Sequence, residues 1–383
     1  MATTPGQSQK TIFFVIPSLG AGGAERVAVN LCKGLSAARW HPVFVTLLGG
    51  GAYARELPPH AEHIDLGKHG WWDNPATIVR LARLLRERQP DLIHTRIYFM
   101  ALITWLARAI ARSSARQVSA VDNTLSLSLE DERLTGVRRW MCRRVLPRND
   151  HLVATSRGVR DDLVRNFRVP QERCAVISNG VDVGVVRRRM REALEADRRP
   201  DEGPLLVAAG RLVPQKNYPL LLRAFALVRE SIPARLLILG EGREKQKLVD
   251  LTRSLGVRDA VEFCGFVNNP FKYFRAADLF VMSSDWEGFG NVVIEAMACG
   301  TPVVSTRYRH GAEEIITDGT DGLLVPCGDE EALAEAIRRV LEDEALRREL
   351  GAVAYGHARD FDNAKIARQY EELFLSVLGC SDD

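Results

Sequence analysis

Residues 284–304 have the sequence SDWEGFGNVVIEAMACGTPVV, which predicts a strand end, a glycine-rich turn, one helix and the start of the next strand. Two acids, Glu287 and Glu295, bracket the turn, and Glu295 is expected about two turns along the helix. Glycines let backbone N–H groups come close to a ligand, and a helix N-terminus favours an anion. The stretch therefore predicts a phosphate cradle between two carboxylates that can accept hydrogen bonds from hydroxyl groups.

The same alternation of short apolar runs and amphipathic stretches extends along the chain. The expected strands are residues 11–16, 42–48, 92–95, 117–121, 151–154, 205–209, 235–239, 261–264, 279–282, 302–305 and 323–325. The expected helices are residues 24–37, 75–87, 99–111, 137–146, 157–166, 218–229, 243–255, 291–298, 330–341, 344–358 and 363–378. Strands separated by helices are typical of βαβ units in a parallel sheet, so the predicted fold class is α/β.

A chain of 383 residues is long enough for two domains, and a polar, charged passage at residues 187–203 separates two series of such units. We therefore predict doubly wound domains at residues 1–185 and 204–360, with a final amphipathic helix at 363–383 packing back onto the first. In open parallel sheets, ligands bind outside the carboxyl ends of the strands. The predicted functional loops are accordingly 17–23, 210–217, 240–242 and 283–290.

The loop at residues 210–217, GRLVPQKN, follows the first strand of the second domain and carries two cations, Arg211 and Lys216. Arginine offers phosphate a two-pronged fork and lysine a point charge, so the pair can neutralise a diphosphate. The alternative is two solvated loop cations. The downstream pair of Glu287 and Glu295 favours the diphosphate interpretation.

The second half resembles the retaining glycosyltransferases of family 4. The matching pieces are GRLVPQKN, LLILGEG, VEFCGFV, ADLFVMSSDWEGFGNVVIEAMACGTPVVST and GLLVP, which cover most of residues 205–326. The first half contains PSLGAGGAERVAVNLCKGL, which is similar to the opening of the acceptor domain in bacterial members that build lipid-linked glycans. The resemblance implies a GT-B fold, in which two Rossmann-like domains face an interdomain cleft.

The resemblance also implies roles for residues. Arg211 and Lys216 would hold the donor diphosphate, Glu287 would bind the donor sugar, and Glu295 would hold the ribose hydroxyls. Catalysis would fall to Arg211, Lys216 and Glu287, and we add Asp122 as a candidate from the loop in which this chain departs from the family. The other implied donor-binding residues lie on the predicted loops and are Gly22, Gly23, Gly240, Glu241, Gly242, Phe266, Val267, Gly288, Phe289, Gly290 and Asn291.

One departure from the family concerns the acceptor-domain loop after the fourth strand. Many members carry a histidine there, whereas this chain has Ser119-Ala120-Val121-Asp122-Asn123-Thr124. Asp122 or Asn123 is a candidate to replace it as a hydrogen-bond partner of acceptor or sugar, and capping of the next segment is the alternative. We expect His94, at the end of a strand, to be a packed residue and not a base.

Other motifs argue against competing classes. The spacing G-x-G-x-x-G and a P-loop are both missing, which disfavours a dehydrogenase and a P-loop nucleotidase. Asp360-Phe361-Asp362 is interpreted as helix capping and not as a metal motif. The seven cysteines form no C-x-x-C pair, so we expect neither a metal site nor a disulfide framework. No metal and no cofactor is predicted.

Charge is divided unevenly along the chain. Residues 1–200 carry 31 Lys and Arg against 19 Asp and Glu, a net charge of +12, and since the whole chain carries +3, the remainder carries −9. Arginines alternate there with Trp71, Trp72, Trp105 and Trp140. This pattern suits an anionic membrane face or a phosphate-bearing acceptor, and an ordinary solvated face is the alternative. No nucleic-acid motif accompanies it, and no apolar run approaches the roughly 20 residues of a membrane span.

These observations predict a cytoplasmic glycosyltransferase, peripheral at the inner face of the cytoplasmic membrane. It would move a hexose or N-acetylhexosamine from a nucleotide-diphosphate sugar, preferably a UDP-sugar, to a lipid-linked or polysaccharide acceptor. Three alternatives stay open: transfer to a soluble small-molecule acceptor, a nucleotide-sugar epimerase of the same fold, and a non-catalytic binder.

Overall fold

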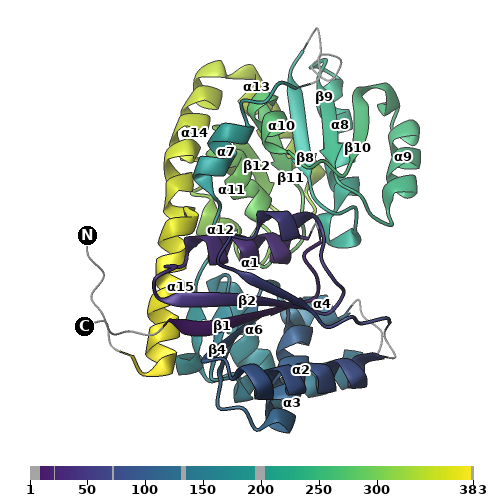
Figure 1. Cartoon of the computed structure of the whole chain (residues 1–383). Helices are drawn as coiled ribbons and strands as arrows, with labels where there is room; N and C mark the ends of the chain where they lie inside the picture. Colours follow the sequence, from purple (N-terminus) through teal and green to yellow (C-terminus); the bar gives the residue numbers. More distant parts are fainter. Residues whose placement is uncertain (1–8, 21, 71–72, 131–134, 195–202, 381–383) are drawn as a thin grey trace, which may run out of the picture. The chain divides into compact units, whose positions relative to one another are not determined.

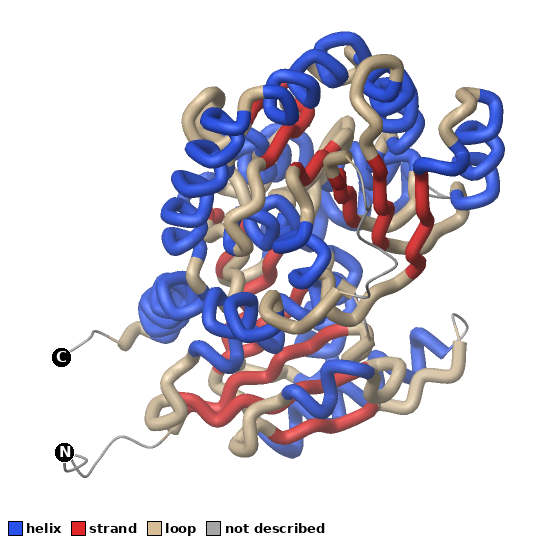
Figure 2. The backbone as a smooth tube through the Cα atoms, turned by 90° about the horizontal axis from the view of Figure 1, so that it is seen from above, coloured by secondary structure: helices blue, strands red, loops and turns tan. Residues whose placement is uncertain are grey.

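The computed structural model describes residues 9–20, 22–70, 73–130, 135–194 and 203–380, and the chain divides into two compact units. Unit 1 comprises Met1–Gly180 and Asn363–Asp383, and unit 2 comprises Val181–Asp362. Trp71, Trp72 and part of the predicted 187–203 linker lie outside the described residues. In the tube view, the strands are flanked by helices (Figure 2).

Unit 1 contains a parallel sheet with the strand order β3-β2-β1-β4-β5-β6-β7. Its strands are β1 (Lys10–Ile16), β2 (Trp40–Thr46), β3 (Glu62–Asp65), β4 (Leu92–Arg96), β5 (Arg116–Val121), β6 (His151–Ala154) and β7 (Cys174–Val176). The apolar residues of β1 alternate between the two faces of the sheet, and both faces are covered by helices, as continuous apolar strands require.

Different helices cover the two faces of this sheet. The helices of unit 1 are α1 (Gly23–Gly34), α2 (Asn74–Arg88), α3 (Tyr98–Ala111), α4 (Leu125–Glu130), α5 (Thr135–Val145), α6 (Arg157–Phe167) and α15 (Asn363–Leu378). Phe14 and its neighbours pack against α1 and α15 on one face, whereas Phe13 packs with α2 and α3 on the other. Figure 1 shows α1 on one side of β1 and β2, with α2 and α3 on the opposite side.

The C-terminal helix α15 belongs to unit 1 although it ends the chain. Tyr370 and Phe374 are fully buried in the core with α1. The carboxylate of Glu371 accepts hydrogen bonds from the indole Nε1 of Trp40 at 2.9 Å and from the amide of Ser36 at 2.8 Å. The helix predicted at the end of the chain is therefore part of the first unit's core.

Unit 2 repeats the architecture with a six-stranded parallel sheet in the order β10-β9-β8-β11-β12-β13. The strands are β8 (Leu205–Ala209), β9 (Arg235–Leu239), β10 (Val261–Gly265), β11 (Leu279–Met282), β12 (Val303–Thr306) and β13 (Leu323–Val325). The helices are α7 (Val183–Arg189), α8 (Tyr218–Arg229), α9 (Lys245–Ser254), α10 (Phe271–Ala276), α11 (Asn291–Ala298), α12 (Ala312–Ile315), α13 (Glu330–Glu342) and α14 (Glu344–His357).

Each face of the second sheet has its own apolar cluster. One joins the sheet to α8 and α13, and the other joins it to α10, α11 and α14. Both units therefore have the doubly wound, Rossmann-like architecture that the sequence predicts, and the predicted fold class is confirmed.

The elements that the sequence analysis missed are short. Strands β3 and β7 lie at the two edges of the first sheet, where only one neighbour has to be paired. Strand β3 has the polar sequence EHID, and β7 has three residues, so neither carries a periodic apolar signal. Helix α4, with six residues, is too short to show helical periodicity. None of the described helices is both long and apolar enough to cross a lipid bilayer.

Candidate functional site

The strand order places the candidate site before any side chain is considered. In each sheet the first three strands are added in one direction from the first strand, and the later strands are added on the opposite side of that first strand. The direction of strand addition therefore reverses between β1 and β4 in unit 1 and between β8 and β11 in unit 2. Crevices at the carboxyl ends of such strands bind ligands. In unit 2 the two loops at this point are the ones that carry Arg211, Lys216 and Glu287.

Glycines allow the loops of unit 2 to approach one another closely. The amide of Gly210 donates to the carbonyl of Leu239 at 2.9 Å, and the amide of Gly240 donates to that of Gly265 at 2.7 Å. Gly240 has φ +140°, and a Cβ there would collide with the carbonyl oxygen of Gly210. A side chain at Gly240 would therefore push apart the loops that follow β8 and β9.

Side chains connect the loop after β8 to the loop after β11. The side-chain amide of Asn217 donates to the carboxylate of Asp285 at 2.8 Å. Gln215 donates to the carbonyl of Trp286 at 2.9 Å, and the hydroxyl of Ser283 donates to the carbonyl of Lys216 at 2.9 Å. Together these bonds fix the two loops at the switch point against each other.

This arrangement brings two predicted site residues into contact. The Nζ of Lys216 lies 2.7 Å from Oε1 of Glu287, and the two side chains are only 15% and 10% exposed. An ion pair that is largely removed from water is held in a defined geometry, because either charge alone would be costly to bury. The pair therefore presents an ammonium and a carboxylate together at the carboxyl edge of the sheet.

Two buried tyrosines, which the sequence analysis did not identify, surround this pair. Burial raises the pKa of Tyr218, and the nearby charge of Glu287 raises it further. The pKa of Tyr308 is raised well above its usual value for the same two reasons. Both phenols stay neutral and donate: Tyr218 to the carbonyl of Gly210 at 3.2 Å, and Tyr308 to that of Phe289 at 2.7 Å.

The N-terminus of α11 is shaped by Gly290, which precedes the helix with φ +103°. A Cβ added at Gly290 would strike the hydroxyl of Tyr308. The backbone can adopt this turn without strain only at glycine. Glu295 is 4% exposed. It lies about one turn into the helix and not about two, because α11 begins at Asn291.

Arg211 and Phe266 differ from these buried groups because both are exposed. The guanidinium of Arg211 makes no ion pair or hydrogen bond with any residue that the structure describes. Phe266 is 57% exposed and directly follows the end of β10. A cation without a side-chain partner in the described part of the chain and an exposed aromatic ring thus occur on the same sheet edge as the Lys216–Glu287 pair.

In unit 1 the structure gives Asp122 a partner that the sequence did not suggest. Arg96, at the end of β4, is fully buried and forms a two-pronged ion pair with the carboxylate of Asp122. The same guanidinium donates to Asn179 at 2.7 Å and to the hydroxyl of Tyr370 at 3.4 Å. Asp122 is 19% exposed in its side chain, so it keeps one side open at the carboxyl edge of this sheet.

His94 is confirmed as a packed residue. Its ring lies 5.5 Å from the rings of Phe14, Tyr370 and Phe374, and burial, with a smaller effect of Arg96, lowers its pKa to about 3. Gly22 and Gly23 lie at the start of α1, and a Cβ at Gly22 would meet the carboxylate of Glu25. Apart from its chain neighbours and the backbone of its own helix, no atom of the described residues lies within 4 Å of the position that a Cβ at Gly23 would take.

Comparisons with known proteins agree on one family. Residues 190–357 match the family model described as "Glycosyl transferases group 1", and residues 21–185 match "Glycosyltransferase Family 4". A Campylobacter jejuni protein named N-acetylgalactosamine-N,N'-diacetylbacillosaminyl-diphospho-undecaprenol 4-alpha-N-acetylgalactosaminyltransferase is 30% identical over 367 residues, covering 94% of this chain and 98% of that protein. The lipopolysaccharide core biosynthesis glycosyltransferase LpsE of Rhizobium meliloti is 39% identical over 205 residues, covering 52% and 57%.

Solved structures support the architecture. HepE of Anabaena, in complex with UDP and glucose, superimposes with a TM-score of 0.80 at 23% identity and covers 96% of this chain and 100% of that one. Sucrose-phosphate synthase of Thermosynechococcus elongatus superimposes with a TM-score of 0.80 at 22% identity, covering 97% and 100%. At these identities the likeness shows a shared fold.

Proposed function

The chain belongs to the family 4 glycosyltransferases of the GT-B type, and on this basis we propose that it transfers a hexose or N-acetylhexosamine from a UDP-sugar to a lipid-linked glycan acceptor, with retention of configuration. The observation that carries the proposal is the Lys216–Glu287 contact of 2.7 Å at the switch point of unit 2, on loops that also present the exposed Arg211.

The residues around this pair suit a nucleotide diphosphate. Lys216 and Arg211 supply positive charge, and the amides at the start of α11 supply donors for a phosphate. The exposed ring of Phe266 offers a surface for a base. The relative of known structure from Anabaena was solved with UDP, which supports a uridine nucleotide for this chain as well.

The acceptor is proposed from the relatives. The Campylobacter protein is named for a diphospho-undecaprenol acceptor and an N-acetylgalactosaminyl donor group, and the Rhizobium protein for the lipopolysaccharide core. A polyprenyl-diphosphate-linked or polysaccharide acceptor would place this chain at the inner face of the cytoplasmic membrane, on the cytoplasmic side.

The proposed chemistry relies on stabilising the departing diphosphate. As the bond between sugar and phosphate breaks, negative charge grows on the phosphate, and Lys216 and Arg211 would neutralise it. The departing phosphate would take the proton of the acceptor hydroxyl on the same face of the sugar. Glu287 orients Lys216 and accepts hydroxyl hydrogen bonds from the sugar. Loss of one preorganised group of this kind costs roughly 100- to 1,000-fold in rate.

Thermal melting with UDP, GDP and ADP tests the donor site. A nucleotide at 100 times its Kd adds about 2.7 kcal/mol of stability, so UDP should raise the Tm clearly. Arg211→Ala and Lys216→Ala should each abolish most of this rise. Arg253→Ala and Lys247→Ala, which remove exposed cations from α9, are matched controls and should leave it unchanged. Equal Tm rises with UDP in the two loop variants and in the two α9 controls would overturn the assignment of Arg211 and Lys216 to a diphosphate.

Incubation with a UDP-sugar separates the remaining alternatives. A transferase gives at most slow hydrolysis without acceptor and forms product when a lipid-linked acceptor is added. An epimerase converts the sugar without acceptor, and a binder does neither. Product formed only with a soluble hydroxyl compound would move the proposal to a small-molecule acceptor.

A further inference from the structure

The exposed apolar side chains of unit 1 are concentrated in one region. Six large apolar residues are at least 36% exposed among the described residues of this unit, and all except Leu48 lie on α2, α3 and α5. These five are Val79 (52%), Leu106 (36%), Ile110 (50%), Val137 (55%) and Trp140 (59%). Single exposed apolar residues are ordinary, but a cluster on neighbouring helices indicates an interaction surface.

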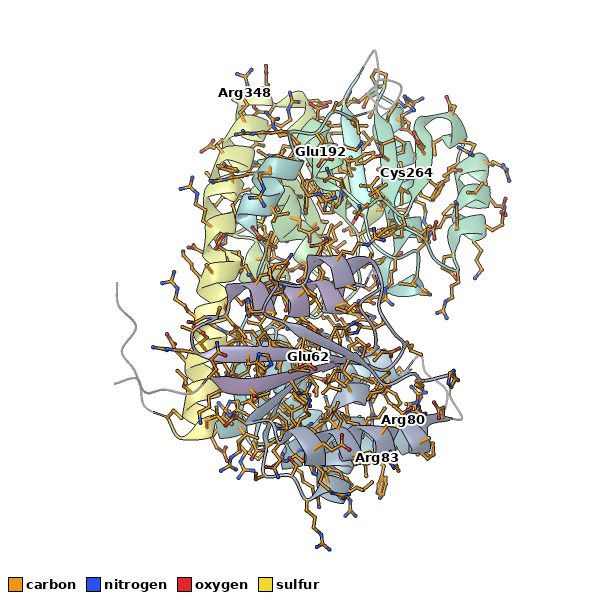
Figure 3. All side chains as sticks on the ribbon, viewed as in Figure 1. Glu62, Arg80, Arg83, Glu192, Cys264 and Arg348 are labelled. Atoms are coloured by element: carbon orange, nitrogen blue, oxygen red, sulfur yellow. The ribbon has the colours of Figure 1, made fainter. Side chains whose placement is uncertain are left out.

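The three helices form one continuous layer on a single face of the sheet. Arg86 of α2 donates to the carbonyl of Ile110 at the end of α3 at 3.1 Å, and Arg138 of α5 donates to the hydroxyl of Tyr98 at the start of α3 at 3.0 Å. Helix α3 contributes to the apolar clusters beneath both of its neighbours. Figure 1 shows α2 and α3 side by side, and Figure 3 labels Arg80 and Arg83 on α2.

The charge on this layer has one dominant sign. The exposed basic residues of the three helices are Arg83, Arg86, Arg88, Arg143 and Arg144, and Glu87 is their single exposed acid. Helices α3 and α5 contain no Asp or Glu. The guanidinium of Arg144 lies over the ring of Trp140, 5.5 Å from its centroid, so that cationic and aromatic groups are interleaved.

We propose that this outer face of α2, α3 and α5, termed the basic-apolar face, docks onto an anionic lipid bilayer. The proposal rests on the proposed lipid-linked acceptor and adds the surface that brings the enzyme to it. Arginines bind lipid phosphates, while tryptophan and aliphatic side chains enter the boundary between headgroups and acyl chains.

Charge favours a bilayer over a second copy of this chain as the partner. In a two-fold dimer built on this face, the same patch would meet itself, and arginines would oppose arginines. Arg88 already pairs with Glu62 of β3. An anionic bilayer instead neutralises the other exposed guanidinium groups while it covers the apolar residues between them.

Flotation with liposomes tests the proposal on the full chain. The protein should float with vesicles of phosphatidylcholine that contain about a third phosphatidylglycerol, should stay at the bottom with pure phosphatidylcholine, and should detach at high salt because of screening. The triple variant Trp140→Ser/Arg143→Gln/Arg144→Gln should reduce the floating fraction at least tenfold. The control Leu48→Ser/Arg55→Gln/Arg368→Gln removes one exposed apolar residue and two exposed arginines of unit 1 elsewhere and should float like the native chain.

The Tm rise with UDP, measured on the same samples, separates this inference from the proposed function. The triple variant should keep the full rise, which also shows that it is folded. Equal flotation of the two variants, or equal flotation with neutral and anionic vesicles, would overturn the docking assignment. A dimer in solution that only the Trp140 variant loses would assign the face to a second copy. Flotation without any UDP effect would leave the docking face standing and remove the proposed donor site.

Discussion

At the scale of single residues, the charges that matter are paired with partners that restrict them. Lys216 is held by Glu287 in unit 2, and Arg96 is held by Asp122, Asn179 and Tyr370 in unit 1. A buried guanidinium with its carboxylate is stable only as a pair, because removing one member leaves the other charge buried without compensation. The buried side chain of Arg96 thus fixes the position of Asp122, which the sequence predicted as a candidate site residue.

The substitution Asp122→Asn should destabilise unit 1 by roughly 3–5 kcal/mol, because it leaves the charge of Arg96 without its counterion. Tyr370→Phe should cost only about 1 kcal/mol, the typical net value of one hydrogen bond. Urea unfolding measures both. The double variant Arg96→Met/Asp122→Leu should be more stable than Asp122→Asn alone, because it removes both charges of the pair. A double variant less stable than Asp122→Asn would show that the unpaired charge of Arg96 is not the cause of the destabilisation.

At the scale of elements, helix α15 completes a core that begins about 350 residues earlier in the chain. Its apolar side chains pack on α1, and Glu371 accepts from Trp40 and Ser36. A chain that ends at Asp362 should therefore have a destabilised, partly unfolded unit 1, because apolar surfaces of α1 and of the sheet would become exposed to water.

Hydrogen exchange measured by mass spectrometry checks this outcome unit by unit. In the chain that ends at Asp362, amides of β1, β4 and β5 should exchange much faster, whereas those of β8 and β11 should keep their protection. A chain that ends at Gly379 is the control, since it retains the whole of α15. Unchanged protection of β1 in the shorter chain would show that α15 is not needed for the core of unit 1.

At the scale of the whole molecule, each unit has its own core and contains a histidine with a shifted pKa, the buried His94 in unit 1 and the half-buried His357 in unit 2. These two histidines respond to pH in opposite directions. The pKa of His94 is lowered to about 3 by burial first and by Arg96 second, with a weaker opposing effect of the Val118 backbone. The pKa of His357 is raised, first by its hydrogen bond to Asp321, whose carboxylate lies 2.6 Å away, with burial opposing.

The sign of each effect follows from linkage. His94 contributes stability above its usual pKa of about 6.5, and this contribution is lost as the pH falls toward 3. His357 contributes stability fully below about 6.5, and this contribution is lost as the pH rises through its raised pKa. Unfolding free energies of the native chain, His94→Phe and His357→Gln at pH 5 and pH 8 measure this. From pH 8 to pH 5, the stability of the native chain should fall relative to that of His94→Phe and rise relative to that of His357→Gln. If both stability differences changed in the same direction, the assigned pKa shifts would be contradicted.

The sequence by itself determined the repeating strands and helices, the α/β class and the loops that carry Arg211, Lys216 and Glu287. These features are local: periodicity fixes which segment is a strand or helix, and the order of strands in a doubly wound sheet fixes which loops share an edge. The short edge strands β3 and β7 were missed because a strand with one partner needs little apolar sequence.

Only the tertiary structure decided which side chains meet. Tyr370 reaches Arg96 across 274 positions in sequence, and Glu371 reaches Trp40 across 331. No local pattern encodes such pairs, because the energy that selects them arises when separate elements pack and bury polar groups that must then find partners. The same holds for Tyr218 and Tyr308, and for the basic-apolar face, which exists because α2, α3 and α5 turn their outer sides in one direction.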